Sequence, residues 1–182
     1  MVTADKIYTV EQFNTFAQQH PDKLLQLIHG RIVEKVTSEE HGSIGGNILA
    51  ELRQWKRQNN IQGFYSMEAS VELSDDDKNY RRPDVSFRLT TGEIGKQGTL
   101  KEVPQFVVEV KSPTDNVRAL REKAQFYLDN GAKLVWLIYP SQRIVEVYHE
   151  DGTVDLFDDE ALLSGGSVLR GFEMSASDIF EV

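Results

Sequence analysis

The spacing of apolar residues changes along the chain, and each change predicts a different secondary-structure element. Between residues 40 and 59 apolar side chains recur every three or four positions, which is the spacing of one helix face. These apolar residues are Ile44, Ile48, Leu52 and Trp55. The pattern predicts a long amphipathic helix whose other face carries Arg53, Lys56 and Arg57.

Two further helices are predicted from the residues at their ends. Thr9 and Gln12 have the spacing of a capping box, which marks a helix start. This helix should end before Pro21, because the residue before a proline avoids helical backbone angles. The other helix should span about 114 to 130 and stop at Gly131, which allows a left-handed backbone.

Apolar runs bounded by turn residues predict strands in the remaining chain. Two strands flank His29-Gly30, which we interpret as a tight hairpin turn. Further strands are predicted at 64–73, 80–89, 104–111, 133–139, 143–148 and 153–157, with a loop at 90–102. The strand, helix, strand unit from 106 to 139 should form a right-handed parallel crossover. Together these elements predict an α/β fold with a mixed β-sheet flanked by helices.

The length and composition are those of an ordinary globular chain. With 182 residues, 40% of them hydrophobic and 27% charged, we expect a single domain over residues 1–182. The first residues lack the apolar stretch of a signal peptide, and no apolar run approaches the roughly 18 residues that span a bilayer. We therefore expect a cytoplasmic protein with no membrane partner. The chain has no cysteine, which excludes disulfides and cysteine-bound metals.

The negative charge is concentrated at the C-terminal end. The net charge is −9, and residues 146–182 contain ten acidic residues and one basic residue, Arg170. The other residues are balanced, with 19 basic and 19 acidic side chains. A neutral body can still carry a basic groove. We therefore expect the acidic segment 146–182, and Asp158 to Glu160 in particular, to lie away from any site that binds nucleic acid.

Three charged residues lie on or beside two of the predicted strands. Glu109 and Lys111 share one strand face, because side chains alternate along a strand. If the strand after Asp84 pairs in register with this strand, Asp84 and Glu109 converge. Two close carboxylates repel, and a bound divalent cation such as Mg²⁺ or Mn²⁺ removes that cost. The alternative interpretation is that these are solvent-exposed charges of little energetic weight.

These residues resemble a known nuclease signature. Pro83-Asp84 followed by Glu109-Val110-Lys111 resembles the PD-(D/E)xK motif of the restriction-endonuclease-like nuclease superfamily. More narrowly, "RRPDVSF", "FVVEVKSPTDN" and "KAQFYLDNGAKLVWLIYP" are similar to the Uma-two family of endonucleases, over about residues 24 to 148. The resemblance implies a restriction-endonuclease-like mixed sheet, Asp84 and Glu109 as ligands of Mg²⁺ or Mn²⁺, and Lys111 as the catalytic lysine.

The resemblance also implies a role for the predicted hairpin. Glu34 falls where the family carries a glutamate that can complete the acidic cluster; alternatively, Glu34 is an edge-strand residue beside Lys35. The "DGE" that is common in the family at this hairpin is His29-Gly30-Arg31 here, a departure from the pattern.

Three more residues are candidates for substrate binding. His41 starts the long helix and could contact a substrate phosphate, or it could simply cover the helix end. Lys123 and Tyr127 are one helical turn apart and could both face the site. The alternative for this pair is a lysine that extends to solvent and a half-buried ring.

Other kinds of site lack their sequence signatures. "HGSIGGN" has no Gly-Lys-Ser/Thr ending, "DDDKN" lacks the EF-hand glycine and glutamate, and the four histidines form no zinc-binding pair. The family resemblance, by contrast, implies a metal-dependent endonuclease that hydrolyses phosphodiester bonds in DNA. The family's lack of a separate recognition domain implies a homodimer, because one small domain offers limited surface for a duplex. Two alternatives remain open: an RNA nuclease, and a non-catalytic module that keeps the fold and binds nucleic acid or protein.

Overall fold

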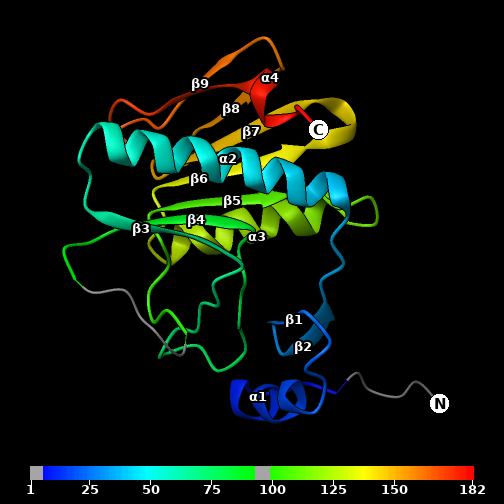
Figure 1. Cartoon of the computed structure of the whole chain (residues 1–182). Helices are drawn as coiled ribbons and strands as arrows, with labels where there is room; N and C mark the ends of the chain where they lie inside the picture. The colour runs from blue at the N-terminus through cyan, green and yellow to red at the C-terminus, as the bar shows by residue number, and fades with distance from the viewer. Residues whose placement is uncertain (1–5, 93–98) are drawn as a thin grey trace.

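A six-stranded mixed sheet forms the centre of the computed structural model, which describes residues 6–92 and 99–182 (Figure 1). Its strands, in spatial order, are β3 (Gly63–Met67), β4 (Val85–Leu89), β5 (Phe106–Val110), β6 (Leu134–Tyr139), β7 (Ile144–His149) and β8 (Val154–Phe157). Only β5 and β6 are parallel neighbours, and α3 (Val117–Asp129) connects them. The predicted α/β class, the mixed sheet and the parallel crossover are confirmed.

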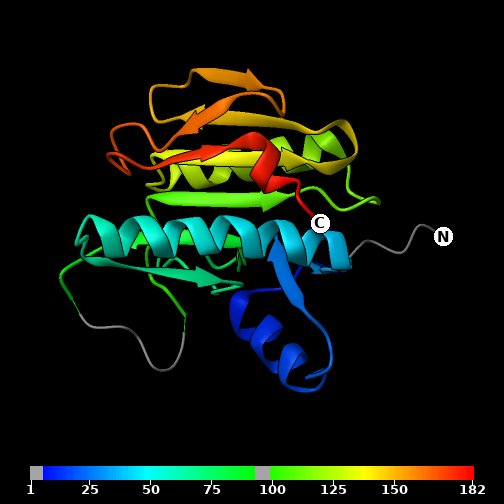
Figure 2. The same ribbon diagram turned by 45° about the horizontal axis from the view of Figure 1, so that its top comes forward.

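Helices cover both faces of the sheet. The long helix α2 (Glu39–Gln58) crosses one face and α3 lies on the other, as Figures 1 and 2 show. Along β5, Val108 packs in the core under α2, whereas Val107 packs in the core under α3. Because both faces are covered, central strands can be apolar at every position, as "LVWLIY" is in β6. A charged residue at such a position is therefore buried unless it lies at a strand end.

The acidic C-terminal segment completes the core under α2. It contains β9 (Leu162–Ser164), β10 (Glu173–Ser175) and the short helix α4 (Ala176–Ile179), which lie over the same sheet face as α2 (Figure 2). Phe172 is buried between Trp55 and Trp136, with ring centroids 5.8 and 6.0 Å away. Besides its acidic residues, this segment thus contributes buried apolar residues to the core, which the sequence analysis did not predict.

The N-terminal elements form a smaller unit beside the main sheet. Helix α1 (Val10–Gln18) begins with the predicted capping box, and β1 (Leu25–Ile28) and β2 (Arg31–Glu34) form the predicted hairpin. At its turn His29 and Gly30 have φ values of 49° and 76°. Positive values at both positions are those of a tight hairpin turn whose twist suits the strands.

Some predicted boundaries are wrong. The strands expected at 64–73 and 80–89 are shorter in the structure: β3 ends at Met67 and β4 begins at Val85. Glu68 adopts a positive φ of 55°, which ends the extended backbone of β3. Helix α3 starts at Val117 rather than near 114, since the Asn116 side chain caps it. The loop expected at 90–102 lies partly outside the described residues, which omit 93–98.

A short 3₁₀ turn, η1 (Pro140–Gln142), connects β6 to β7. Among the described helices, none is both long enough and apolar enough to cross a membrane.

A polar cluster surrounds Glu146 in β7. Its side chain is buried and accepts hydrogen bonds from the hydroxyls of Tyr139 and Tyr148, both at 2.9 Å, and from Arg121 Nε at 3.1 Å. Burial opposes ionisation, but the hydrogen bonds from Arg121 and the two tyrosines outweigh it and lower the pKa of Glu146 below its ordinary value. The ionised carboxylate therefore stabilises the folded state.

We expect Glu146→Gln to lower the free energy of unfolding at neutral pH. Because the pKa of Glu146 is lower in the folded than in the unfolded chain, its contribution is fully present above the ordinary value of 4.5 and is lost as the pH falls through the folded-state pKa. The difference between wild type and variant should therefore shrink in acid. Urea denaturation at neutral and decreasing pH measures it. Glu150→Gln, at an exposed pair with Lys133, is the control and should change little.

Candidate active site

Three acidic residues lie in a row at one end of the main sheet. Met67 pairs with Val85 in the β3–β4 ladder, and Val85 pairs with Val108 in the β4–β5 ladder. Continuing the β4–β5 register by one residue places Asp84 opposite Glu109, while the Glu68 N–H donates to the carbonyl oxygens of Pro83 and Asp84 on the other side. Directly opposed residues share a sheet face, with Cβ atoms about 4.5–5.5 Å apart. Asp84 and Glu109 therefore lie on one face, as the sequence analysis expected.

Asp84 is held as a buried carboxylate. It is 2% exposed, and its Oδ2 accepts a hydrogen bond from the Val110 N–H at 2.6 Å. Oδ2 also lies 3.1 Å from His41 Nε2, while Oδ1 pairs with Lys35 Nζ. Burial raises the pKa of Asp84, but His41 and Lys35 outweigh burial and lower it overall. The site thus contains an ionised carboxylate out of contact with bulk water.

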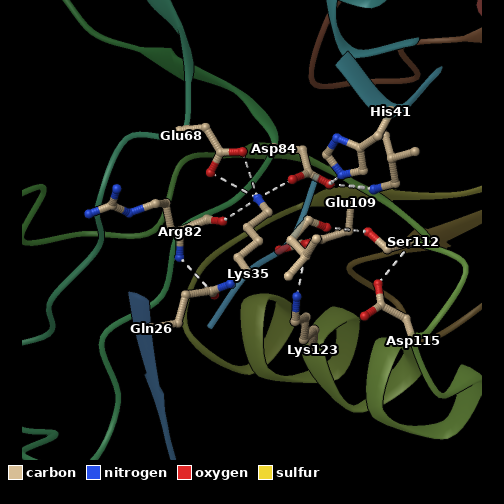
Figure 3. A network of polar contacts seen from close by, with 12 residues as sticks. Gln26, Lys35, His41, Glu68, Arg82, Asp84, Glu109, Ser112, Asp115 and Lys123 are labelled. Atoms are coloured by element: carbon tan, nitrogen blue, oxygen red, sulfur yellow. Dashed lines mark hydrogen bonds and ion pairs between the residues drawn. The ribbon is translucent and has the colours of Figure 1, made fainter. Parts of the chain in front are cut away.

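Lys35 lies at the centre of the polar network in Figure 3. Its Nζ donates to both carboxylate oxygens of Glu68 at 2.8 Å and to the carbonyl oxygen of Arg82 at 3.2 Å, besides pairing with Asp84. Burial lowers the pKa of Lys35, but Asp84, Glu109 and Glu68 outweigh it and raise the pKa above its ordinary value. Lys35 is therefore a buried ammonium group that contacts two carboxylates and lies within the electrostatic influence of a third, Glu109.

The sequence analysis gave no site role to Lys35 or Glu68. One signal was available for Lys35, because side chains alternate along a strand and Glu34 and Lys35 therefore point to opposite sides. The carboxylate of Glu34 points outward: its side chain is 46% exposed and pairs with Lys23 at 2.5 Å. Glu34 still lines the cavity beside the site, and its part in the acidic cluster stays a prediction.

Glu109 is fixed by two residues of α3. It is 1% exposed; Tyr127 donates its hydroxyl hydrogen to Oε1 at 2.7 Å, and Lys123 Nζ lies 3.1 Å from Oε2. Burial and the neighbouring Glu109 raise the pKa of Tyr127 well above its ordinary value, so the hydroxyl remains a donor. Lys123 and Tyr127 thus face the site, although their contacts are with Glu109.

Lys111 lies just beyond the end of β5 and is half-buried. Its Nζ donates a hydrogen bond to the carbonyl oxygen of Ser112 at 3.0 Å, and its N–H donates to Ile138. Among the described residues, those that line the neighbouring cavity do not include Lys111. The catalytic role of Lys111 therefore stays a prediction.

A cavity of about 260 Å³ opens beside these residues. It is lined by Gln26, Ile28, Val33, Glu34, Lys35, Val36, His41, Glu109, Val110, Ser112, Thr114, Asp115, Ala119 and Lys123. No described residue of the acidic segment 146–182 is part of this lining, which agrees with the expected placement of that segment. His41 is buried at the first turn of α2; its burial lowers the pKa of the imidazole, but Asp84 raises it overall.

The oxygen donors of the site have the chemistry that Mg²⁺ and Mn²⁺ prefer. Carboxylate oxygens of Glu68 and Asp84 and the Arg82 carbonyl oxygen already surround a positive charge, the ammonium group of Lys35. As they stand, no three His, Asp or Glu side chains within 6–92 and 99–182 are arranged to hold a metal ion. The donor set fits a hard cation, provided that Lys35 releases the carboxylates it now holds.

Comparisons with known proteins identify the family and the fold of the chain. The profile of the Uma2 family, described as "Putative restriction endonuclease", matches residues 10–177. A crystal structure from Anabaena variabilis, described as "a putative nuclease belonging to DUF820", is similar with a TM-score of 0.80 and 21% sequence identity. That match covers 94% of this chain and 97% of the other chain, and shows that the fold is shared. No curated protein matches the sequence.

Proposed function

The chain belongs to the Uma2 family, and on that premise we propose that it is a Mg²⁺- or Mn²⁺-dependent endonuclease that hydrolyses phosphodiester bonds in DNA. The proposal rests on the burial of Asp84 and Glu109, which are 2% and 1% exposed on neighbouring strands beside a cavity. Carboxylates in the interior are costly unless they are paired or bind a metal. Their burial contradicts the interpretation that they are solvent-exposed charges.

Each residue of the site has a role in this proposal. Asp84, Glu109 and Glu68 would hold the cation, and His41 keeps Asp84 ionised and oriented. A bound divalent cation would neutralise phosphate charge and activate water. Tyr127 orients Glu109.

Lys111, at the end of β5, would stabilise the negative charge that develops on the phosphate. We also propose that the active form is a homodimer, because a second copy enlarges the surface available to a duplex.

A cleavage assay tests the proposed function. The purified protein is incubated with labelled duplex, single-stranded and branched DNA and with RNA, each with Mg²⁺, with Mn²⁺ and with a chelator. We expect cleavage of DNA that requires the metal. Cleavage of RNA alone would establish the RNA nuclease, and no cleavage under any condition would favour the non-catalytic module.

Lys111→Ala separates catalysis from binding. If Lys111 stabilises charge in the transition state, its removal should lower turnover by roughly 10²-fold and leave substrate affinity nearly unchanged. Single-turnover kinetics and equilibrium binding on the same duplex measure the two effects. Lys133→Ala, at an exposed lysine paired with Glu150, is the control. An unchanged rate for Lys111→Ala would remove Lys111 from the mechanism.

A further inference from the structure

The ammonium group of Lys35 lies where the oxygen donors of the site converge. Its side chain is 8% exposed, and its contacts with Glu68, Asp84 and the Arg82 carbonyl group come from two separate segments of the chain. This set of carboxylate and carbonyl oxygens around one buried positive charge is the kind of environment that a hard metal ion prefers. Lys35 therefore occupies the position that a cation would need.

The backbone around Glu68 keeps this environment in place. Glu68 has a φ of 55°, which is uncommon for a residue with a Cβ atom. Its N–H donates to the carbonyl oxygens of Pro83 and Asp84 at 3.1 and 3.2 Å. The conformation thus ties Glu68 directly to the segment that carries Asp84, and both carboxylates contact Lys35 (Figure 3).

The charged cluster at the site differs in composition and burial from an ordinary surface ion pair. The pair of Lys23 with Glu34 joins one ammonium group to one carboxylate at the surface, with side chains 38% and 46% exposed. At the site, three carboxylates (Glu68, Asp84 and Glu109) meet two lysines, Lys35 and Lys123. Replacing the single charge of Lys35 by a doubly charged ion would neutralise the cluster more completely.

We propose that Lys35 is a resident cation that a divalent metal ion must displace from Asp84 and Glu68, so that Lys35 sets the metal affinity of the site. The inference rests on the proposed metal dependence. A displaced ammonium group has room nearby, because Lys35 lines the cavity of about 260 Å³. Metal binding and the Lys35 ion pairs are then mutually exclusive, and weakening one must strengthen the other.

Calorimetric titration with Mn²⁺ alone tests the inference through binding rather than cleavage. Lys35→Met keeps the length and apolar stem of the side chain but removes its charge. We expect it to bind Mn²⁺ about tenfold or more tightly than wild type. Lys23→Met, which removes the lysine of the exposed pair, should bind like wild type. Equal or weaker binding by Lys35→Met, or no binding by any variant, would overturn the inference.

A second measurement uses the wild-type protein, in case Lys35→Met folds poorly. An amine-reactive reagent followed by mass spectrometry reports how accessible each lysine is. Mn²⁺ should increase the labelling of Lys35 several-fold and leave Lys23 unchanged; labelling of Lys35 that Mn²⁺ does not change contradicts displacement. Because neither experiment measures cleavage, a protein that binds metal in this way but cuts no DNA would overturn the proposed function and leave this inference standing.

Discussion

Asp84→Asn should lower the turnover of DNA cleavage by on the order of 10³-fold. Asparagine has nearly the same shape but no charge, so the change removes the negative charge that Lys35 contacts at Oδ1 and His41 at Oδ2. A divalent cation loses a strong ligand for the same reason. The hydrogen bond that the Val110 N–H donates to Oδ2 can be kept by the asparagine oxygen, so the strand ends should stay together.

Single-turnover kinetics on a labelled duplex at saturating metal would measure this effect, with circular dichroism as the check on folding. Asp77→Asn is the matched control, because Asp77 is 69% exposed and its only ion pair in the described part of the chain is with Lys78 at 3.4 Å. It should cleave like wild type. A folded Asp84→Asn protein that cleaves at the wild-type rate would show that the chemistry lies elsewhere.

Phe172→Ala should lower the free energy of unfolding by about 3–5 kcal/mol. Phe172 is 1% exposed and packs against Trp55 of α2 and Trp136 of β6. Its truncation removes buried apolar surface and leaves a cavity between two large rings that cannot close around it. Urea denaturation followed by tryptophan fluorescence would measure the change.

Leu162→Ala is the control for this prediction. Leu162 belongs to the same acidic segment and is 60% exposed, so its truncation should change the free energy of unfolding by less than about 0.5 kcal/mol. If Phe172→Ala were equally mild, the C-terminal segment would not be part of the core. The segment would then be available as the separate docking surface of the non-catalytic alternative.

The central sheet and the pair of Asp84 and Glu109 could be predicted because they depend on local rules. Alternation along β5 fixes the face of Glu109, and apolar runs reveal neighbouring strands. Register then brings Asp84 opposite Glu109. The sequence prediction had to assume that these two strands pair, and the family resemblance selected the same residues.

Lys35 and Glu68 could not be predicted in the same way. They are 33 residues apart and meet only because the β1–β2 hairpin lies beside the end of β3 and β4. No periodic pattern in the sequence indicates that Lys35, just after the hairpin, contacts Glu68, just after β3. The sequence analysis chose Glu34 because of the family pattern. In the structure Glu34 is largely exposed, and the next residue, Lys35, is the buried one.

The C-terminal elements were missed for a different reason. Strands β9 and β10 have three residues each and α4 has four, which is too short for a period of two or of 3.6 to be recognised. Their buried residues, such as Leu163 and Met174, are separated by acidic and glycine residues. Only the assembled core shows that these apolar residues belong together.

The register of the central strands also places an apolar residue between two charged clusters. Glu109 pairs with Leu137 of β6, and Leu137 pairs with Glu146 of β7. The buried Leu137 is thus an apolar spacer between the carboxylates around Lys35 and the cluster of Arg121 with Glu146. Each cluster has its own basic residues, Lys35 and Lys123 in one and Arg121 in the other. We therefore expect Glu146→Gln to change stability without removing the contacts of Lys35 or Glu109.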